Sequence, residues 1–326
     1  MNRPTVYIAR PIPEVATELL ASTAEIRQHT GSMPPTREEL LSLVRGCSGI
    51  LSLLSDRIDA EVCEAAGPKL KVVSNFAVGY NNIDVTELRR REIAIGNTPD
   101  VLTDATADVA VSLLLSAARM AGKALEDAKR GHWQTWEPMG WLGLELGIPS
   151  EPKTLGIVGM GRIGQAVAER MQGGWGMNVL YHSRTPKPSV ESKMRAEHVS
   201  LDRLLAESDF VSLHTPLNDD TKHLINSTAF SAMKKTCVLV NTARGDIVDQ
   251  DALVDALRDG QIFAAGLDVC TPEPLPVDHP LFTLTNCVLL PHIGSATFRA
   301  RAAMAERAAK NILAGLQSAP LPYPVS

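Results

Sequence analysis

Three polar side chains in the second half of the chain have the chemistry of a proton-transfer site. Glu273 lies between two prolines in T-P-E-P-L-P, which holds its carboxylate on a stiff, non-helical segment. His292 occurs in P-H-I-G-S-A, and a histidine beside a carboxylate can donate a proton to a carbonyl oxygen that gains negative charge. Arg244, in N-T-A-R-G, offers a two-pronged donor for a carboxylate or carbonyl group. Taken singly, such residues are more often structural, but together they suit a 2-oxo acid beside a nicotinamide.

A glycine-rich turn in the middle of the chain predicts a dinucleotide site. Gly159, Gly161 and Gly164 form G-x-G-x-x-G between the apolar run 155–158 and the helical pattern 163–171. The first glycine permits a tight turn, the second lets the backbone approach a pyrophosphate, and the third lets helix and strand pack closely. We expect the pyrophosphate at the helix N-terminus, where N–H groups and the helix dipole favour an anion. A glycine-rich turn in another α/β fold is the alternative.

The residues after the next predicted strand indicate which dinucleotide binds. An NAD site needs a carboxylate at the end of this strand for the ribose 2′-hydroxyl, but none occurs between Glu169 and Glu191. The strand 178–181 is followed instead by hydroxyls and positive charges, namely Ser183, Arg184, Thr185 and Lys187. Because arginine pairs well with phosphate oxygens, we expect NADPH as the cofactor, with NADH weaker. A solvated basic loop whose charges contact nothing is the alternative.

The elements that must position these residues alternate between strand and helix. Residues 49–54 and 238–241 have the character of buried strands, and T-x-x-E from Thr36 is the capping pattern of a helix. Such an alternation predicts an α/β protein with doubly wound parallel sheets, and the first hundred residues repeat the alternation seen later. Residues 97–99 interrupt it, so we place a hinge between two domains near Val101.

Several polar residues stand at the carboxyl ends of predicted strands. Ligands of open α/β sheets bind at these ends. We therefore expect one crevice to gather Thr215, Thr242, Arg244, Asp268 and His292.

A tryptophan-rich segment at 128–150 has no clear helical or strand pattern. It holds Trp133, Trp136 and Trp141, three of the four tryptophans of the chain. Such a segment exposes a large apolar area unless something covers it. We favour an arm that packs on a second subunit over a flap that packs on its own domain.

Composition excludes several classes of protein. A chain of 326 residues suits two domains, and a net charge of −5 without a basic tract gives no reason to expect nucleic acid. The five cysteines are scattered without C-x-x-C, which fits a reducing compartment, and we expect no metal site. No signal peptide and no membrane-spanning run is visible, so a cytoplasmic enzyme is expected.

Seven stretches occur in a recognisable order along nearly the whole chain. They are V-G-Y-N-N-I-D, T-P-D-V-L-T-D-A-T-A-D, G-M-G-R-I-G, N-T-A-R-G, G-L-D-V, P-E-P-L and P-H-I-G-S-A. In these motifs the chain resembles the D-2-hydroxyacid dehydrogenase family. It is most similar to the glyoxylate/hydroxypyruvate reductases, through P-E-P-L-P-V-D-H-P-L, N-C-V-L-L-P-H-I-G-S-A-T and W-x-x-W-x-P. One departure is Asp108, where many relatives have glutamate.

The resemblance implies roles in catalysis and cofactor binding. His292 is the acid/base, Glu273 its partner and Arg244 the substrate anchor. Residues 161–163 hold the pyrophosphate, and Asp268 holds the nicotinamide amide. The expected cofactor residues are Gly159, Gly161, Arg162, Ile163, Gly164, Ser183, Arg184, Thr185, Thr215, Pro216, Thr242, Ala243, Asp268 and Gly294.

The resemblance also implies how the substrate binds. The backbone N–H groups of Val78 and Gly79 bind the substrate carboxylate, and Leu53 lines the pocket, together with Arg244 and His292. Trp141, in its own or the partner's pocket, is expected to limit the size of the substrate.

The domains expected from the family are a flavodoxin-like substrate domain and a Rossmann coenzyme domain. The first is discontinuous, over residues 1–102 and 296–326, and the second covers residues 103–295. Closure of the two domains is expected to exclude water and complete the site. A homodimer is expected through the coenzyme domain and the loop from Trp133 to Trp141.

The implied reaction is the reduction of glyoxylate and hydroxypyruvate to glycolate and D-glycerate, with hydride from NAD(P)H and a proton from His292. Another dehydrogenase on the same scaffold, acting on a different D-2-hydroxyacid or on phosphite, is one alternative. A non-catalytic nucleotide-sensing protein is another, although no disordered tail is visible. Glu273 itself argues against a formate dehydrogenase, which carries glutamine there.

Overall fold

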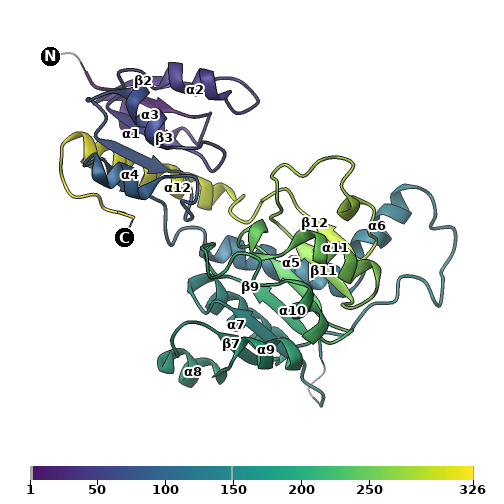
Figure 1. Cartoon of the computed structure of the whole chain (residues 1–326). Helices are drawn as coiled ribbons and strands as arrows, with labels where there is room; N and C mark the ends of the chain where they lie inside the picture. Colours follow the sequence, from purple (N-terminus) through teal and green to yellow (C-terminus); the bar gives the residue numbers. More distant parts are fainter. Residues whose placement is uncertain (1–2, 148–149, 326) are drawn as a thin grey trace. The chain divides into compact units, whose positions relative to one another are not determined.

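The computed structural model describes residues 3–147 and 150–325 and divides the chain into two compact units. Unit 1 comprises Met1–Leu102 and Ala296–Ser326, and unit 2 comprises Thr103–Ser295. Each unit has its own parallel β-sheet with helices around it (Figure 1). The predicted α/β class with parallel sheets is therefore confirmed.

The sheet of unit 1 has five strands in the order β2-β1-β3-β4-β5. The strands are β1 (Thr5–Ile8), β2 (Glu25–Gln28), β3 (Gly49–Ser52), β4 (Val72–Asn75) and β5 (Ala94–Gly96). The helices are α1 (Val15–Ala21), α2 (Arg37–Leu43), α3 (Ala60–Ala66), α4 (Val85–Arg90) and α12 (Phe298–Leu316). Helix α12 comes from the end of the chain and packs against α1, β3 and β4, so this unit is built from two separate stretches.

The sheet of unit 2 has seven strands in the order β12-β11-β10-β9-β6-β7-β8. The strands are β6 (Thr154–Val158), β7 (Asn178–His182), β8 (Ala196–His198), β9 (Phe210–Leu213), β10 (Val238–Asn241), β11 (Ala264–Leu267) and β12 (Cys287–Leu289). The α-helices are α5 (Thr103–Ala118), α6 (Ala121–Lys129), α7 (Arg162–Trp175), α8 (Pro188–Met194), α9 (Leu201–Glu207), α10 (Ser227–Ala232) and α11 (Gln250–Arg258), with short 3-10 turns at Gly245–Ile247 and Pro280–Phe282. The direction of winding reverses between β6 and β9, which is where such sheets bind ligands.

Both faces of the unit 2 sheet are buried, which explains why its central strands are mostly apolar. Val238 and Val240 pack in the hydrophobic cluster that includes side chains of α5 and α7. Leu239, between them, packs on the opposite face with side chains of α9, α10 and α11. Successive strand residues point to opposite faces, so a strand covered on both sides is mostly apolar, with few polar exceptions such as Ser212 and Asn241.

Helix α5 runs through the core of unit 2 against β10, β11 and α7. Its small and apolar side chains, such as Ala110, Leu113 and Leu114, are buried. Among the described residues, no single helix is long and apolar enough to span a membrane, although α5 and α6 together, bent by 72°, meet the same test of length and composition.

Two local expectations can be compared with the structure. The capping pattern at Thr36 is confirmed, because Thr36 Oγ1 accepts the N–H of Glu39 at 3.3 Å and Glu39 Oε2 accepts the N–H of Thr36 at 2.7 Å. The expected end of the helix after the glycine motif was wrong, since α7 continues to Trp175 and ends at Gly176 in the left-handed conformation. Each glycine costs a helix about 1 kcal/mol relative to alanine, but Trp175 packs against the core cluster of unit 2, so α7 continues through the Gly-Gly pair.

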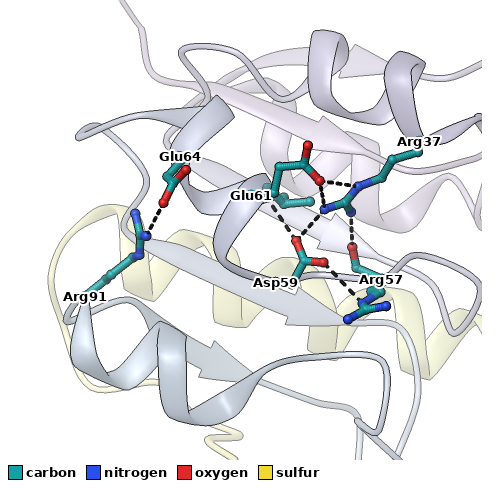
Figure 2. A network of polar contacts seen from close by, with 7 residues as sticks. Arg37, Arg57, Asp59, Glu61, Glu64 and Arg91 are labelled. Atoms are coloured by element: carbon teal, nitrogen blue, oxygen red, sulfur yellow. Dashed lines mark hydrogen bonds and ion pairs between the residues drawn. The ribbon is translucent and has the colours of Figure 1, made fainter.

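An ion network in unit 1 holds the loop between β3 and α3 (Figure 2). Arg37, the first residue of α2, contacts Asp59 Oδ1 at 2.5 Å and Glu61 Oε2 at 2.7 Å, and donates to the carbonyl of Arg57 at 3.0 Å. Asp59 also caps α3 by accepting the N–H of Val62. Burial by itself would raise the pKa of Asp59, but these donors hold it below its ordinary value. The network therefore fixes the loop that begins at the expected pocket residue Leu53.

We expect Arg37→Ala to lower the free energy of unfolding by about 1 kcal/mol at pH 7, since the network is part-exposed and screened. A lowered pKa in the folded state contributes stability above the ordinary value of 3.8 for Asp59, and this is lost as the pH falls through the lowered value. The difference in the free energy of unfolding between the variant and the wild type should therefore become smaller at acidic pH. Denaturant titrations at pH 7 and near pH 3 measure this difference, with Arg45→Ala, at an exposed arginine of the same unit outside the network, as control. An equal loss at both pH values would contradict this assignment.

Candidate functional site

The loops that follow β10, β11 and β12 bring Arg244, Glu273 and His292 to one edge of the unit 2 sheet. His292 Nδ1 lies 2.8 Å from Glu273 Oε2. The other carboxylate oxygen, Oε1, accepts the N–H of Cys270 at 3.1 Å. Because the carboxylate occupies Nδ1, the ring is oriented and Nε2 is the nitrogen left to exchange a proton with a substrate.

Glu273 is charged at neutral pH. Its burial favours the neutral form, but the hydrogen bond from His292, the N–H of Cys270 and the charge of Arg244 together hold its pKa below the ordinary value. Burial lowers the pKa of Arg244, and the nearby Glu273 opposes this change. An arginine keeps its charge under such a perturbation, because its ordinary pKa is so high. The site therefore combines a fixed cation with a carboxylate–histidine pair.

The turn that carries Arg244 is held by a side chain at the end of β10. Asn241 donates through Nδ2 to the carbonyl of Arg244 at 2.8 Å and accepts the N–H of Ala243 at 3.0 Å. A Cβ on Gly245 would lie 2.2 Å from the carbonyl oxygen of Cys270. Only glycine therefore allows the turn after β10 to approach the loop that leads to Glu273.

Asp268 holds the segment that carries His292. This side chain follows β11 and is 1% exposed, and its two oxygens accept the N–H groups of Ile293 and Gly294, each at 2.7 Å. Thr106 of α5 also donates to the carbonyl of Gly294, at 3.1 Å. Burial raises the pKa of Asp268 in spite of these donors. Sequence reasoning missed this role, whose only signal is that Asp268 and His292 follow neighbouring strands.

The glycine turn between β6 and α7 has two glycines that the fold requires and one that it does not. Gly159 has φ +97°, and its Cβ would lie 2.6 Å from the carbonyl carbon of His214. A Cβ on Gly164 would lie 2.3 Å from the carbonyl oxygen of Gly159. Gly161 precedes α7 without a side-chain cap, and a Cβ there would meet nothing within 4 Å. The open space at the helix N-terminus is where an anion binds.

The neighbouring strand ends add two features beside this turn. Thr215 and Pro216 follow β9, and Thr242, which follows β10, has a buried Oγ1 with no hydrogen-bond partner among the described residues. His214, which sequence reasoning did not single out, lies 2.8 Å through Nε2 from Ser212 Oγ. Burial lowers the pKa of His214 to about 3, so this ring is neutral beside the glycine turn.

The loop after β7 has no carboxylate available for a ribose hydroxyl. Ser183 Oγ donates to the carbonyl of Thr185 at 2.8 Å, and Arg184 is exposed. The first carboxylate that follows in the chain, Glu191, accepts the hydroxyl of Tyr181 at 2.6 Å. Arg184 is thus an exposed positive charge of this loop, and Lys187 is a second positively charged residue before α8.

Residues 111–294 match the family model described as the NAD binding domain of D-isomer specific 2-hydroxyacid dehydrogenase. This match covers more than half of the chain. The chain belongs to the D-2-hydroxyacid dehydrogenase family. The resemblance found in its motifs is thereby confirmed.

Known members of the family match this dehydrogenase along nearly its whole length. A glyoxylate reductase/hydroxypyruvate reductase from Homo sapiens is 46% identical over 319 residues, which cover 97% of this chain and 96% of that protein. A glyoxylate reductase from Thermococcus kodakarensis is 49% identical over 316 residues, which cover 96% and 93%. The crystal structure of an NADPH-dependent glyoxylate/hydroxypyruvate reductase from Sinorhizobium meliloti, in complex with NADP and malonate, has a TM-score of 0.85 at 32% identity and covers 100% of this chain and 97% of that one.

The residues of unit 2 fit a dinucleotide. The open N-terminus of α7 at Gly161 suits a pyrophosphate, and the unpaired Thr242 Oγ1 suits a polar group of the same ligand. Arg162, Ile163, Ala243 and Gly294 lie in the same strand-end loops or the first turn of α7. The contact of Asp268 with a nicotinamide amide stays a prediction, since the structure gives both its oxygens to backbone N–H groups.

Other expected substrate residues lie outside this cluster. Leu53 follows β3, and Val78 and Gly79 follow β4, all in unit 1. Trp141 lies in the loop after α6 and donates through Nε1 to Asp127 Oδ2 at 2.8 Å.

The tryptophan loop leaves much of its apolar surface uncovered. Trp133 is 66% exposed and Trp136 is 81% exposed. Of the expected segment 128–150, residues 148–149 lie outside the described part of the chain. The homodimer through this loop stays a prediction.

We expect Gly161→Ala to fold like the wild type but to bind NADPH at least about tenfold more weakly, because its methyl group takes the space of the pyrophosphate. Its φ of −77° is open to alanine. Gly174→Ala, in the same helix and also without a neighbour within 4 Å, is the matched control and should leave binding unchanged. Fluorescence titration with NADPH and thermal unfolding of each variant measure the two effects. Unchanged binding in Gly161→Ala would rule out a pyrophosphate at this turn.

Proposed function

We propose that this dehydrogenase reduces glyoxylate and hydroxypyruvate to glycolate and D-glycerate, with NADPH as the preferred cofactor. The observation that carries the proposal is the His292–Glu273 pair, which stands with Arg244 at the carboxyl edge of a dinucleotide-binding sheet. The curated relatives that match nearly the whole chain are named for this reaction. A carboxylate–histidine pair beside an arginine suits a substrate that holds a carbonyl next to a carboxylate.

Each residue of the site has a task in this reaction. The reduced nicotinamide, when bound, supplies the hydride that adds to C2 of the 2-oxo acid. Arg244 binds the substrate through its guanidinium group and stabilises negative charge on the substrate oxygens. His292 gives the proton from Nε2 to the C2 oxygen, which converts the carbonyl to a hydroxyl. Glu273 keeps the ring oriented and supports its positive form between turnovers, because the carboxylate stays ionised.

The preference for NADPH is supported by the loop after β7. Arg184 is exposed there, and the carboxylate of Glu191 is engaged with Tyr181. A guanidinium group stabilises the 2′-phosphate of NADPH, whereas a carboxylate accepts a hydrogen bond from the 2′-hydroxyl of NADH. Ser183 and Thr185 are proposed to add polar contacts beside Arg184.

The substrate contacts proposed in unit 1 are the N–H groups of Val78 and Gly79, which bind the carboxylate, and the side chain of Leu53, which lines the pocket. Trp141 is proposed to limit the size of the substrate. A variant Trp141→Ala that accepts the same range of 2-oxo acids as the wild type would count against this last role.

We expect the purified protein to oxidise NADPH rapidly with glyoxylate or hydroxypyruvate and more slowly with pyruvate, as followed by the loss of NADPH absorbance. His292→Ala should lower kcat by about 10²- to 10⁴-fold, the usual contribution of a general acid. The affinity for NADPH should hold in this variant, and the exposed His223→Ala is the control for a histidine outside the site. No turnover of any 2-oxo acid, despite tight binding of NADPH, would overturn the proposed reaction.

We expect Arg184→Ala to weaken the binding of NADPH by about tenfold and to leave the binding of NADH unchanged, because only NADPH carries the 2′-phosphate. Arg195→Ala removes another exposed arginine of unit 2 and serves as the control. The dissociation constants of NADPH and NADH, measured for each variant, give the preference for NADPH over NADH directly. A parallel loss for NADPH and NADH would show that Arg184 does not read the 2′-phosphate.

A further inference from the structure

The loop that follows β4 in unit 1 presents consecutive backbone N–H groups without partners. Within residues 3–147 and 150–325, the N–H groups of Val78, Gly79 and Tyr80 make no hydrogen bond. All three residues are half-buried. Backbone N–H groups in folded proteins are almost always paired, with protein groups, with water or with a ligand. A run of three such groups therefore suits a ligand that carries acceptor oxygens, as a carboxylate does.

Two asparagines hold the carbonyl groups of two of these peptide units, those that carry the N–H groups of Gly79 and Tyr80. Asn97 Nδ2 donates to the carbonyl of Val78 at 2.8 Å, and Asn75 Nδ2 donates to the carbonyl of Gly79 at 2.8 Å. In a trans peptide unit the carbonyl and the N–H point in opposite directions. Asn97 therefore directs the N–H of Gly79 away from its own carboxamide, and Asn75 does the same for the N–H of Tyr80.

Asn75 is itself fixed by the sheet. It is the last residue of β4, it is fully buried, and its register partner on β3 is Ser52, whose hydroxyl donates to Asn75 Oδ1 at 2.9 Å. Asn75 Nδ2 also donates to Asn82 Oδ1 at 3.0 Å. Asn82 in turn donates to the carbonyl of Leu53 at 2.9 Å. One set of carboxamides thus holds both loops of unit 1 that carry expected substrate contacts.

Asn97 is held by its backbone rather than by its side chain. It is 8% exposed, its N–H donates to the carbonyl of Tyr323 at 3.1 Å, and its carbonyl accepts Nδ2 of Asn311 at 3.0 Å. Among the described residues, its carboxamide makes one hydrogen bond, the one to the carbonyl of Val78. A buried carboxamide whose single contact is a loop carbonyl acts on the conformation of that loop.

We propose that Asn75 and Asn97 are positioning residues that preorganise the N–H groups of Gly79 and Tyr80 to bind the carboxylate of the substrate. The identity of that substrate as a 2-oxo acid rests on the proposed function. Hydrogen bonds to an ionised acceptor are about twice as strong as neutral ones, but they yield their full effect only if the donors need no reorganisation. The asparagines supply this rigidity without touching the substrate.

The test compares Asn97→Ala with Ser74→Ala in the full-length protein loaded with NADPH. Ser74 precedes Asn75 on β4, is equally buried, and accepts a hydrogen bond from Asn311, so it controls for the loss of a buried polar contact. We expect Asn97→Ala to raise KM for glyoxylate and Kd for oxamate, an unreactive carboxylate analogue, by about 10- to 100-fold, as for loss of hydrogen bonds to a charged group. The Kd for NADPH should stay within about twofold in both variants, and Ser74→Ala should leave KM unchanged.

The outcomes separate the two proposals. A wild-type protein that binds oxamate but reduces no 2-oxo acid refutes the proposed function, and the oxamate titration then still decides the role of Asn97. An unchanged oxamate Kd in a folded Asn97→Ala, or an equal change in Ser74→Ala, overturns the positioning role. If Asn97→Ala does not fold, Asn75→Ser gives the same comparison, with the same rise expected. A wild-type protein with no affinity for oxamate also overturns the inference.

Discussion

The catalytic edge of unit 2 depends on one buried carboxylate. Asp268 is withdrawn from water, and a buried charge must be paired or fully hydrogen-bonded to be tolerated. It meets this need with the N–H groups of Ile293 and Gly294. The same bonds fix the segment after β12 against the end of β11. Glu273 lies in the loop that follows Asp268, and His292 directly precedes Ile293. The hydrogen bonds of Asp268 therefore help to bring together the two residues proposed to be catalytic, which are 19 positions apart.

Hydrogen bonds from a side chain to the backbone also hold other loops that carry functional groups. Asn241 holds the turn of Arg244, and Asn75 and Asn97 hold the loop after β4. Loop backbones have no ladder of hydrogen bonds to fix them, and a short side chain that bonds to the backbone supplies the missing constraint. Each of these side chains stands at or near the end of a strand, where the sheet fixes its own position. The sheet therefore fixes each of these carboxamides or carboxylates, and each of them in turn fixes the loop backbone that carries a proposed functional group.

The strands and the glycine turn could be predicted from the sequence because each depends on a local pattern of residues. Apolar runs such as Val238–Asn241 and the helix cap at Thr36 depend only on neighbours in the chain, and both are present in the structure. Strand β8 escaped prediction because its three residues are too few to establish a period. The pairing of His292 with Glu273 followed from family motifs and strand ends. The hydrogen bonds of Asp268 and Asn97 could not be predicted from residue spacing. A side chain that bonds to a backbone group far along the chain produces no periodic pattern in the sequence.

Unpaired buried hydroxyls help to separate a binding site from an imperfection of packing. Leaving such a group without a partner costs about 1–3 kcal/mol, so its position in the fold matters. Ser208 Oγ is unpaired where α9 ends, before β9 begins, at the amino edge of the sheet, where no ligand is expected. Thr242 Oγ1 is unpaired at the carboxyl edge, just past β10 and beside the switch point. Ser208 Oγ is explained by close packing against Gly156, whereas Thr242 Oγ1 stands where the proposed dinucleotide would supply a partner.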